Sequence, residues 1–264
     1  MKLGFIGCGN MAKAMISGII KNGVCSAEDI IVSAKTEATL QKAQAEYGVH
    51  TAKANAEVAK ASDAFVLAVK PQFYAEVIAE IRDSVRPEQL VITIAPGKTL
   101  AWLSEQFGRP VQLVRTMPNT PAMVGEGITA VCCSDDLPQK TLDCALKILR
   151  SFGKAEVVPE RLMDAVVSVS GSSPAFVFMF IEAMADAAVA DGMPRKQAYT
   201  FAAQAVLGSA KMVLETGRHP AELKDMVCSP AGTTIEAVRV LEETGFRGSV
   251  MAAMKACTDK AKSV

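Results

Sequence analysis

The stretch GFIGCGNMAKAM, residues 4–15, joins a short apolar segment (2–7) to an amphipathic one (10–23) and fits the pattern Gly-x-Gly-x-x-Ala. In such a turn the first glycine, Gly7, permits a tight bend, and the second, Gly9, lets a pyrophosphate approach the backbone. The N-terminus of the following helix then faces the phosphates. The pattern predicts a strand–turn–helix unit that binds a dinucleotide. The alternative is a tight turn that binds no nucleotide.

The remainder of the chain changes character near residue 160. Before it, β-branched apolar runs alternate with helical stretches, which is the pattern of parallel strands covered on both faces. Further strands are predicted at 29–34, 63–69, 90–95, 111–117 and 127–133. After it, only helices are predicted, at 160–171, 173–192, 194–217, 220–228, 232–245 and 247–262. We therefore predict an α/β protein in which a Rossmann-type parallel sheet (1–159) precedes an all-α dimerisation domain (160–264).

Composition excludes several classes of partner. The chain has 28 Lys and Arg and 28 Asp and Glu residues, so its formal net charge is zero. Nucleic acid is not expected as a partner, because phosphate binding needs a surplus of cations. Seven cysteines without C-x-x-C spacing and only two histidines argue against a zinc site, so no metal is expected. The odd number of cysteines and the lack of a signal peptide indicate reduced thiols and a cytoplasmic protein.

One segment tests the possibility of a membrane span. Residues 175–190 are strongly apolar, but Glu182 and Asp186 interrupt them and they fall short of the ~20 residues that a span needs. We expect a buried helix and no membrane partner. A helix that is apolar on all sides must be surrounded, and a small domain cannot surround several of them. A dimer through the helical domain is therefore expected.

The end of the second strand selects the cofactor. An NAD enzyme usually carries an acid there for the ribose hydroxyls. This chain has Ser33 and Lys35, with no acid before Glu37. A hydroxyl and a cation suit the 2′-phosphate of NADP, so NADPH is expected, with NADH as a weaker alternative. Lys35 as an ordinary surface lysine is the competing interpretation.

Loops at the other strand ends should border the same cofactor, because ligands of open α/β sheets bind beyond the carboxyl ends of the strands. The sequence AVKPQ (68–72) ends one strand, APG (95–97) the next, and MPNTP (117–121) the one after. Lys70 is either a cofactor contact or a helix-end charge. Asn119 either binds a carboxamide or the substrate, or stabilises its own turn.

Two uncharged segments of the second domain are placed at predicted helix starts, namely SGSSPAF (170–176) and CSPAGTTIEA (228–237). Each offers backbone N–H groups beside hydroxyls. Helix capping explains either one alone. The presence of two such segments in one domain, next to a dinucleotide-binding domain, favours a substrate site.

These motifs, in this order, resemble the pyrroline-5-carboxylate reductase family over essentially the whole chain. The resemblance implies NADPH-dependent reduction of a cyclic imine to proline, and homo-oligomers built from dimers of the helical domain. It places cofactor contacts on Gly7, Cys8, Gly9, Asn10, Met11, Ser33, Asn55, Ala68, Val69, Lys70, Pro71, Ala95 and Gly97. It places substrate contacts on Ser229, Pro230, Ala231, Gly232, Thr233 and Thr234. Two departures stand out: Pro96 replaces an alanine of the family pattern, and Ala231 replaces a glycine.

The expected chemistry needs no strong acid. A cyclic iminium is already protonated and accepts hydride at carbon, so hydroxyls suffice; we expect Thr234 to face the ring nitrogen and name Ser229 as the second catalytic candidate. One alternative is another NADP reductase, such as a β-hydroxyacid dehydrogenase, for which Lys211 is the nearest catalytic lysine. Another is an idle NADP-sensing or assembly protein.

Overall fold

The computed structural model describes residues 1–262 and divides the chain into two compact units. The first unit contains Met1–Ser172 together with residues 257–262. The second contains Ser173–Ala256. Each unit is described separately below.

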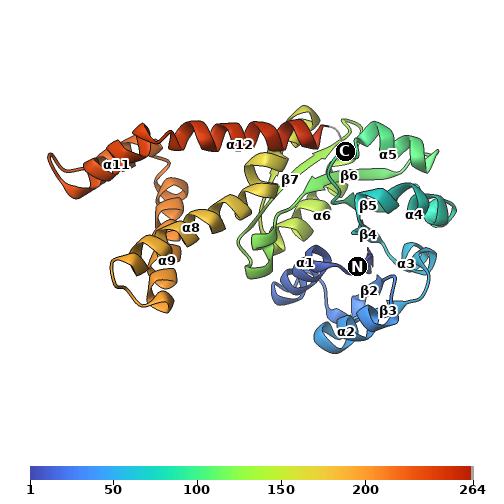
Figure 1. Ribbon diagram of the computed structural model, residues 1–264. Coiled ribbons are helices and arrows are strands. Elements are labelled where there is room, and N and C mark those ends of the chain that lie inside the picture. The colour runs from blue at the N-terminus through green and yellow to red at the C-terminus, as the bar shows by residue number, and fades with distance from the viewer. Residues whose placement is uncertain (263–264) are drawn as a thin grey trace. The chain divides into compact units, whose positions relative to one another are not determined.

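The first unit is built on one eight-stranded sheet with the order β3-β2-β1-β4-β5-β6-β7-β8 (Figure 1). The six predicted strands all form. The strands are β1 (Leu3–Ile6), β2 (Ile30–Ser33), β3 (His50–Ala52), β4 (Ala64–Leu67), β5 (Leu90–Thr93), β6 (Gln112–Met117), β7 (Gly127–Cys133) and β8 (Gly153–Val157). The two strands that the sequence did not predict, β3 and β8, are short and mostly exposed, so they lack a β-branched apolar run.

One strand pair departs from the predicted parallel sheet. β7 runs antiparallel to β6, whereas every other neighbouring pair of the described sheet is parallel. The reason is the length of the connection. A parallel pair needs a crossover of about a dozen residues or more, and the link at 118–126 is too short to provide one. Because β6 is parallel to β5 and β4, the loop after β6 lies at the same edge of the sheet as the loops after β4 and β5.

Helices cover both faces of the sheet. They are α1 (Asn10–Lys21), α2 (Glu37–Tyr47), α3 (Asn55–Ala61), α4 (Tyr74–Ile81), α5 (Leu100–Phe107), α6 (Gln139–Leu149) and the short α7 (Met163–Val166). Alternate residues of β1 separate two cores: Phe5 packs with α1 and α6, and Ile6 with α4 and α5. Both strand faces are therefore apolar, as a doubly covered parallel sheet requires.

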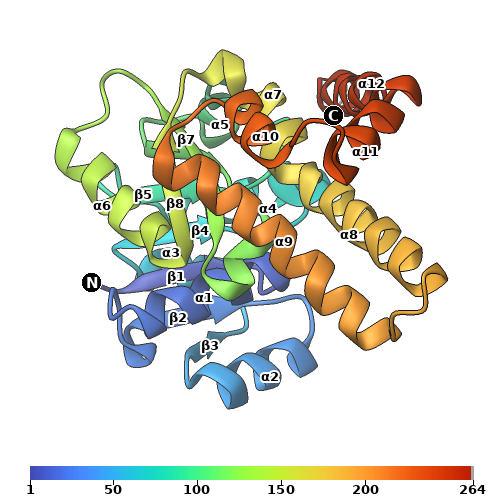
Figure 2. The same ribbon diagram turned by 90° about the vertical axis from the view of Figure 1, so that its left-hand side faces the viewer.

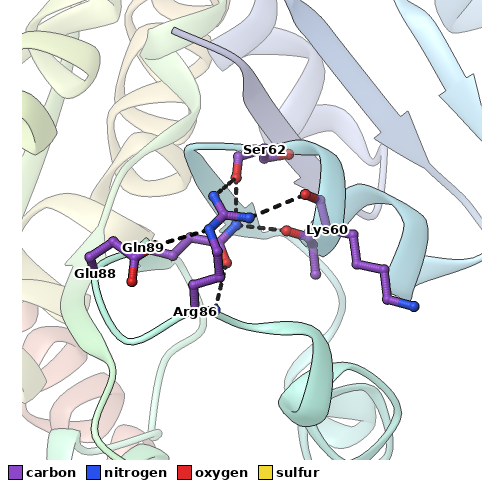
Figure 3. Close-up of polar contacts among 6 residues, drawn as sticks. Lys60, Ser62, Arg86, Glu88 and Gln89 are labelled. Carbon is purple, nitrogen blue, oxygen red and sulfur yellow. Dashed lines mark hydrogen bonds and ion pairs between the residues drawn. The ribbon is translucent and has the colours of Figure 1, made fainter.

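A polar clamp holds the end of α3 (Figure 3). The guanidinium of Arg86 donates to the carbonyl oxygens of Ser62 at 2.8 Å and Lys60 at 3.2 Å. The buried side chain of Gln89 donates to Ala59 and Ser62, each at 2.7 Å. A cation and an amide thus satisfy carbonyls that a helix end leaves unpaired. The clamp fixes α3 against the entry of β5.

The second unit is entirely helical, as predicted, and the described residues after 160 contain no strand. Its helices are α8 (Ser173–Ala190), α9 (Arg195–Thr216), α10 (Pro220–Val227), α11 (Thr233–Glu243) and α12 (Phe246–Ala261), the last of which ends in the first unit. Figure 2 shows α8 and α9 side by side. The predicted stops at Gly192, Gly217 and Gly245 all have positive φ, the conformation that ends a helix at glycine.

The segment predicted as a helix at 160–171 is more varied. It begins with the 3₁₀ turn Glu160–Leu162, continues through α7, and becomes a π-helix at Val167–Ser172. It belongs to the first unit, where Glu160 pairs with Arg115 of β6 at 2.8 Å and Ser168 bonds to Thr258 at 2.9 Å. The compact units divide between residues 172 and 173, and the predicted domain boundary between 159 and 160 stays a prediction.

The apolar helix α8 was expected to be buried, with a second copy of the chain as part of its cover. Within a single chain it is not buried: Phe178 is 64% exposed and Met179 67%, and Ala185 is the buried residue of this helix. By length and composition alone, the helical segment Glu160–Ala190 could cross a membrane. Its middle, however, is the π-helix with its serines, and α8 itself measures about 27 Å at 1.5 Å per residue, slightly less than a bilayer core.

Candidate active site

The glycine-rich turn has the shape that a dinucleotide needs. Gly7 has φ of 97°, and a Cβ there would lie 2.7 Å from the carbonyl oxygen of Ala68. A Cβ on Gly9 would meet nothing within 4 Å, so this backbone faces open space. Gly9 is the N-cap residue of α1 and offers no side-chain hydrogen bond to it. The first turn of this described helix contains no acidic residue. Free N–H groups and the positive end of the helix dipole thus face the space where a pyrophosphate would bind.

Tyr74 fixes the two loops beside that turn. Its side chain is fully buried, and its hydroxyl donates to the carbonyl oxygen of Leu67 at 2.6 Å and accepts from the N–H of Ile94 at 3.3 Å. These atoms lie at the ends of β4 and β5, immediately before the predicted contact loops at 68–71 and 95–97. Burial holds the pKa of the Tyr74 phenol well above its usual value. Sequence reasoning missed this residue, because a tyrosine in a helix carries no local signal of its partner.

A pocket of about 360 Å³ opens beside the end of β2, and we call it the β2 pocket. Four predicted cofactor contacts line it, namely Gly7, Lys35, Asn55 and Val69. The ammonium of Lys35 lies 5.4 Å from the ring centre of Phe73, so this lysine is held over the pocket by a cation–π contact. Lys35 is exposed, so the cofactor contact and the surface-lysine alternative both stay predictions.

Ser33 and Asn55 form one unit in this region. The Ser33 hydroxyl, 1% exposed, donates to the Asn55 side-chain oxygen at 2.7 Å. A second cation, Lys53, also lines the β2 pocket. It was missed because it follows β3, the strand that the sequence did not reveal.

The remaining predicted cofactor residues lie along the same edge. Cys8 is buried, and burial raises the pKa of its thiol. Asn10 begins α1, followed by the half-buried Met11. Lys70 is exposed just before the 3₁₀ turn that Pro71 begins. Ala95 is buried, and Gly97 has φ of 75°. These contacts stay predictions, consistent with their position in the fold.

Asn119 has structural partners for its side chain. Its amide donates to the carbonyl oxygen of Ser170 at 3.1 Å and its oxygen accepts from the N–H of Ile128 at 2.9 Å. The residue is 8% exposed. The turn-stabilising alternative accounts for these contacts, and a role toward substrate stays a prediction.

The segment SGSSPAF is not the helix-start loop that we expected. Ser170 and Ser172 belong to the π-helix Val167–Ser172, which passes directly into α8 at Ser173. Both residues form hydrogen bonds within the first unit. The carbonyl oxygen of Ser170 accepts from the Asn119 amide, and the hydroxyl of Ser172 accepts from the thiol of Cys257 at 3.2 Å. The absence of a proline or glycine before Ser170 to break the helix explains the outcome.

The second uncharged segment does form a loop at a helix start. Ser229 to Gly232 make a tight turn, in which the Gly232 N–H donates to the Ser229 carbonyl at 3.1 Å. Pro230 occupies the second position and Ala231, with φ of 57°, the third. This is the arrangement of a type II turn, whose third position normally takes glycine. A Cβ on Gly232 would lie 2.2 Å from the Ser229 hydroxyl oxygen, so a larger residue would force the Ser229 side chain to move.

The threonines after this turn do not cap α11. The N-cap residue is Gly232, and within residues 1–262 no side chain supplies a cap hydrogen bond to this helix. Thr233 is exposed and Thr234 half-buried, at the first two helical positions. The capping alternative is therefore not what the structure contains. The first N–H groups of α11 and two hydroxyls are left available to a small anion.

Other candidate groups lie elsewhere. Lys211 is 66% exposed and pairs with Glu215 at 3.4 Å on α9. His219 accepts from the N–H of Ala221 at 3.2 Å and so caps α10. All seven cysteines are free thiols. The part of the chain that the structure describes contains no cluster of three or more potential metal ligands.

The fold and these two sites define a dinucleotide-dependent oxidoreductase with a helical second unit. Comparison with known proteins identifies the family: residues 160–264 match the pyrroline-5-carboxylate reductase dimerisation model, and residues 2–97 match that of the coenzyme F420-dependent NADP oxidoreductases. The chain belongs to the pyrroline-5-carboxylate reductase family. The predicted resemblance and fold class are confirmed.

Individual relatives cover the full length. Pyrroline-5-carboxylate reductase of Escherichia coli is 52% identical, over 100% of this chain and 98% of the relative. That of Methanosarcina acetivorans is 45% identical, over 100% and 97%. The structure of pyrroline carboxylate reductase from Plasmodium falciparum with NADP bound superposes with a TM-score of 0.91 at 30% identity, over 100% of this chain and 97% of that one. The predicted NADP cofactor class is confirmed as well.

Proposed function

We propose that this protein catalyses the NADPH-dependent reduction of 1-pyrroline-5-carboxylate to L-proline, the last step of proline biosynthesis. The observation that carries the proposal is the start of α11, where Gly232 leaves the helix uncapped and two threonine hydroxyls flank its N–H groups. Membership of the family across the full chain supports the same reaction.

The substrate carries one carboxylate and one ring nitrogen, and the loop at 229–234 offers a partner to each. The N-terminus of α11 presents free N–H groups and roughly half a positive charge to the carboxylate. Thr234, half-buried, faces the ring nitrogen, and Ser229 contributes its hydroxyl from the preceding turn. Neither role requires an arginine.

The dinucleotide is held by the residues of the first unit. Gly7, Gly9 and the start of α1 receive the pyrophosphate, while Ser33, Lys35 and Asn55 receive the ribose phosphate. NADPH supplies the hydride when bound. NADH is the weaker cofactor, because the lysines of the β2 pocket attract the additional phosphate.

No protein acid is required for the reaction. The iminium form of the substrate already carries the proton on nitrogen, so hydride adds to carbon and the C=N electron pair becomes the amine lone pair. The segment 229–234 contains no titratable acid or base. The Thr234 hydroxyl accepts the N–H of the iminium and keeps contact as the amine forms.

A direct assay tests the reaction. Purified protein with racemic pyrroline-5-carboxylate should consume NADPH and form an equal amount of proline, measured by absorbance and by amino-acid analysis. Consumption of NADPH with a β-ketoacid, and none with pyrroline-5-carboxylate, would instead favour the β-hydroxyacid dehydrogenase alternative. An idle NADP-binding protein would turn over neither compound.

The same proposal includes a homo-oligomer built from dimers of the helical domain. Large apolar side chains are exposed on α8 and α9, including Phe178, Met179, Phe201 and Leu214. A second copy of this surface is the expected cover, as the dimerisation family model supports. The variant Phe178→Asp should sediment as a smaller species than the wild type, and Lys42→Asp on exposed α2 should not. We further propose a cytoplasmic location, where the seven free thiols stay reduced.

A further inference from the structure

The end of β2 lacks the acid of an NAD site, but the structure brings acids to the same place from another helix. Glu76 and Glu80 both line the β2 pocket from α4. They are four residues apart in one helix and therefore lie on one face of it. Glu37, the first acid after β2 in the sequence, does not line this pocket.

Glu80 is fixed there by a chain of hydrogen bonds. Its carboxylate accepts from the side-chain amide of Asn55 at 2.7 Å. The oxygen of the same amide accepts from the Ser33 hydroxyl at 2.7 Å, and Ser33 is buried at the last position of β2. The strand end, where a nucleotide-binding acid is normally found, is thus connected to Glu80 through Asn55.

The charges of the β2 pocket are balanced. Lys35 and Lys53 contribute two cations and Glu76 and Glu80 two anions. The cations suit the 2′-phosphate of NADPH. A carboxylate is the usual acceptor for the ribose hydroxyls of NADH and repels the 2′-phosphate. One pocket therefore contains the recognition groups for both cofactors.

We propose that Glu80 is a specificity-determining residue, which accepts the 2′-hydroxyl of NADH and limits the affinity for NADPH. Asn55 holds its carboxylate in position. Glu76, for which the structure records no bond to Asn55, contributes charge without this contact. The proposal rests on the dinucleotide assignment of the proposed function and not on the identity of the imine.

The test uses equilibrium binding to the full-length protein by calorimetry, without imine or turnover. Adenosine 2′,5′-bisphosphate carries the phosphate of NADPH, and 5′-AMP carries the free hydroxyl of NADH. The variant Glu80→Gln removes the charge and keeps an oxygen acceptor for Asn55. It should bind the bisphosphate about two- to fivefold more tightly, the range expected for an exposed charge pair. It should bind 5′-AMP more weakly by a similar factor.

Two matched variants separate the causes. Glu156→Gln changes the net charge equally on exposed β8, at the opposite edge of the sheet, and should leave both affinities unchanged. Glu76→Gln should strengthen bisphosphate binding and leave 5′-AMP binding unchanged. The proposal would be overturned if Glu80→Gln left the ratio of the two nucleotide affinities unchanged. It would also be overturned if Glu76→Gln changed both affinities as Glu80→Gln does. Wild-type protein that binds neither nucleotide would instead contradict the dinucleotide assignment, and wild-type protein that binds both but does not reduce the imine would contradict the proposed reaction alone.

Discussion

The buried hydroxyl of Tyr74 donates a hydrogen bond of 2.6 Å to the carbonyl oxygen of Leu67. It also accepts from the N–H of Ile94 at 3.3 Å. A helix side chain thereby sets the spacing of two strand ends, and the loops that follow these strands are predicted to border the cofactor.

Replacing Tyr74 by Phe should therefore affect both stability and cofactor binding. The Leu67 carbonyl and the Ile94 N–H would lose a buried partner, which costs about 1 to 3 kcal/mol of unfolding free energy. The KM for NADPH should rise, because the loops at 68–71 and 95–97 lose their spacing. Urea unfolding and steady-state kinetics measure the two effects.

The matched control is Tyr47→Phe, since the Tyr47 hydroxyl donates to Glu46 in an exposed contact. It should change the unfolding free energy little. An equal loss in both variants would show that the Tyr74 hydroxyl has no special role.

The Cys132 thiol gives stability a defined pH dependence. Burial is the main cause that raises its pKa from 9.0 to about 12, and nearby Arg115 opposes the shift only in part. Between pH 9 and 12 the unfolded chain loses this proton while the folded chain keeps it. The unfolded state then binds fewer protons, so the free energy of unfolding falls as pH rises through this window.

A comparison with Cys132→Ala isolates that contribution. Below pH 8 the variant should be less stable than the wild type by a constant amount, because a buried side chain is truncated. Above pH 9 the difference in unfolding free energy between the wild type and the variant should become smaller. Urea unfolding at several pH values measures it, and parallel stability curves up to pH 11 would contradict the assignment.

Ala231 is strained in the present turn. Its φ of 57° is costly for a residue with a Cβ, by about 1 to 2 kcal/mol. Glycine relieves this strain but loses more conformational entropy, by roughly 0.4 to 1 kcal/mol. Ala231→Gly should therefore raise the unfolding free energy by roughly 1 kcal/mol or less, measured by urea unfolding. Ala210→Gly, on exposed helix α9, should lower it instead. A destabilised Ala231→Gly would show that the turn is not strained.

Much of this fold could be predicted because its signals are local. The glycine pattern at 4–15 and the β-branched runs specify a strand, a turn and a helix within a few residues of each other. β3 and β8 were missed because short, exposed strands are specified by pairing with neighbours. The composition of α8 indicated burial, but an apolar helix does not reveal which molecule covers it.

The cofactor site was predictable only where its residues follow strand ends. Gly7, Ser33 and Lys35 occupy such positions. Lys53 follows β3, a strand that the sequence did not reveal. Glu80 lines the β2 pocket from α4, and its approach depends on packing between elements. The bond between Ser33 and Asn55 spans 22 residues of sequence and is likewise set by the fold.

The last prediction concerns Thr234, the residue that we propose faces the ring nitrogen. Thr234→Val preserves the shape of the side chain and removes its hydroxyl. Loss of one hydrogen bond to a charged group costs roughly 1.5 to 3 kcal/mol, so kcat/KM for the imine should fall about tenfold to a hundredfold. NADPH affinity should stay the same. Thermal stability should change little, because the structure records no cap hydrogen bond to α11.

Thr233→Val is the matched control, one residue earlier and more exposed. Its effect on kcat/KM should be smaller than that of Thr234→Val, because its hydroxyl is not assigned to the nitrogen. If Thr234→Val kept full activity and melted at a lower temperature, the hydroxyl would serve the helix and not the substrate. The anion site at the start of α11 would then have to recognise the imine through its backbone N–H groups alone.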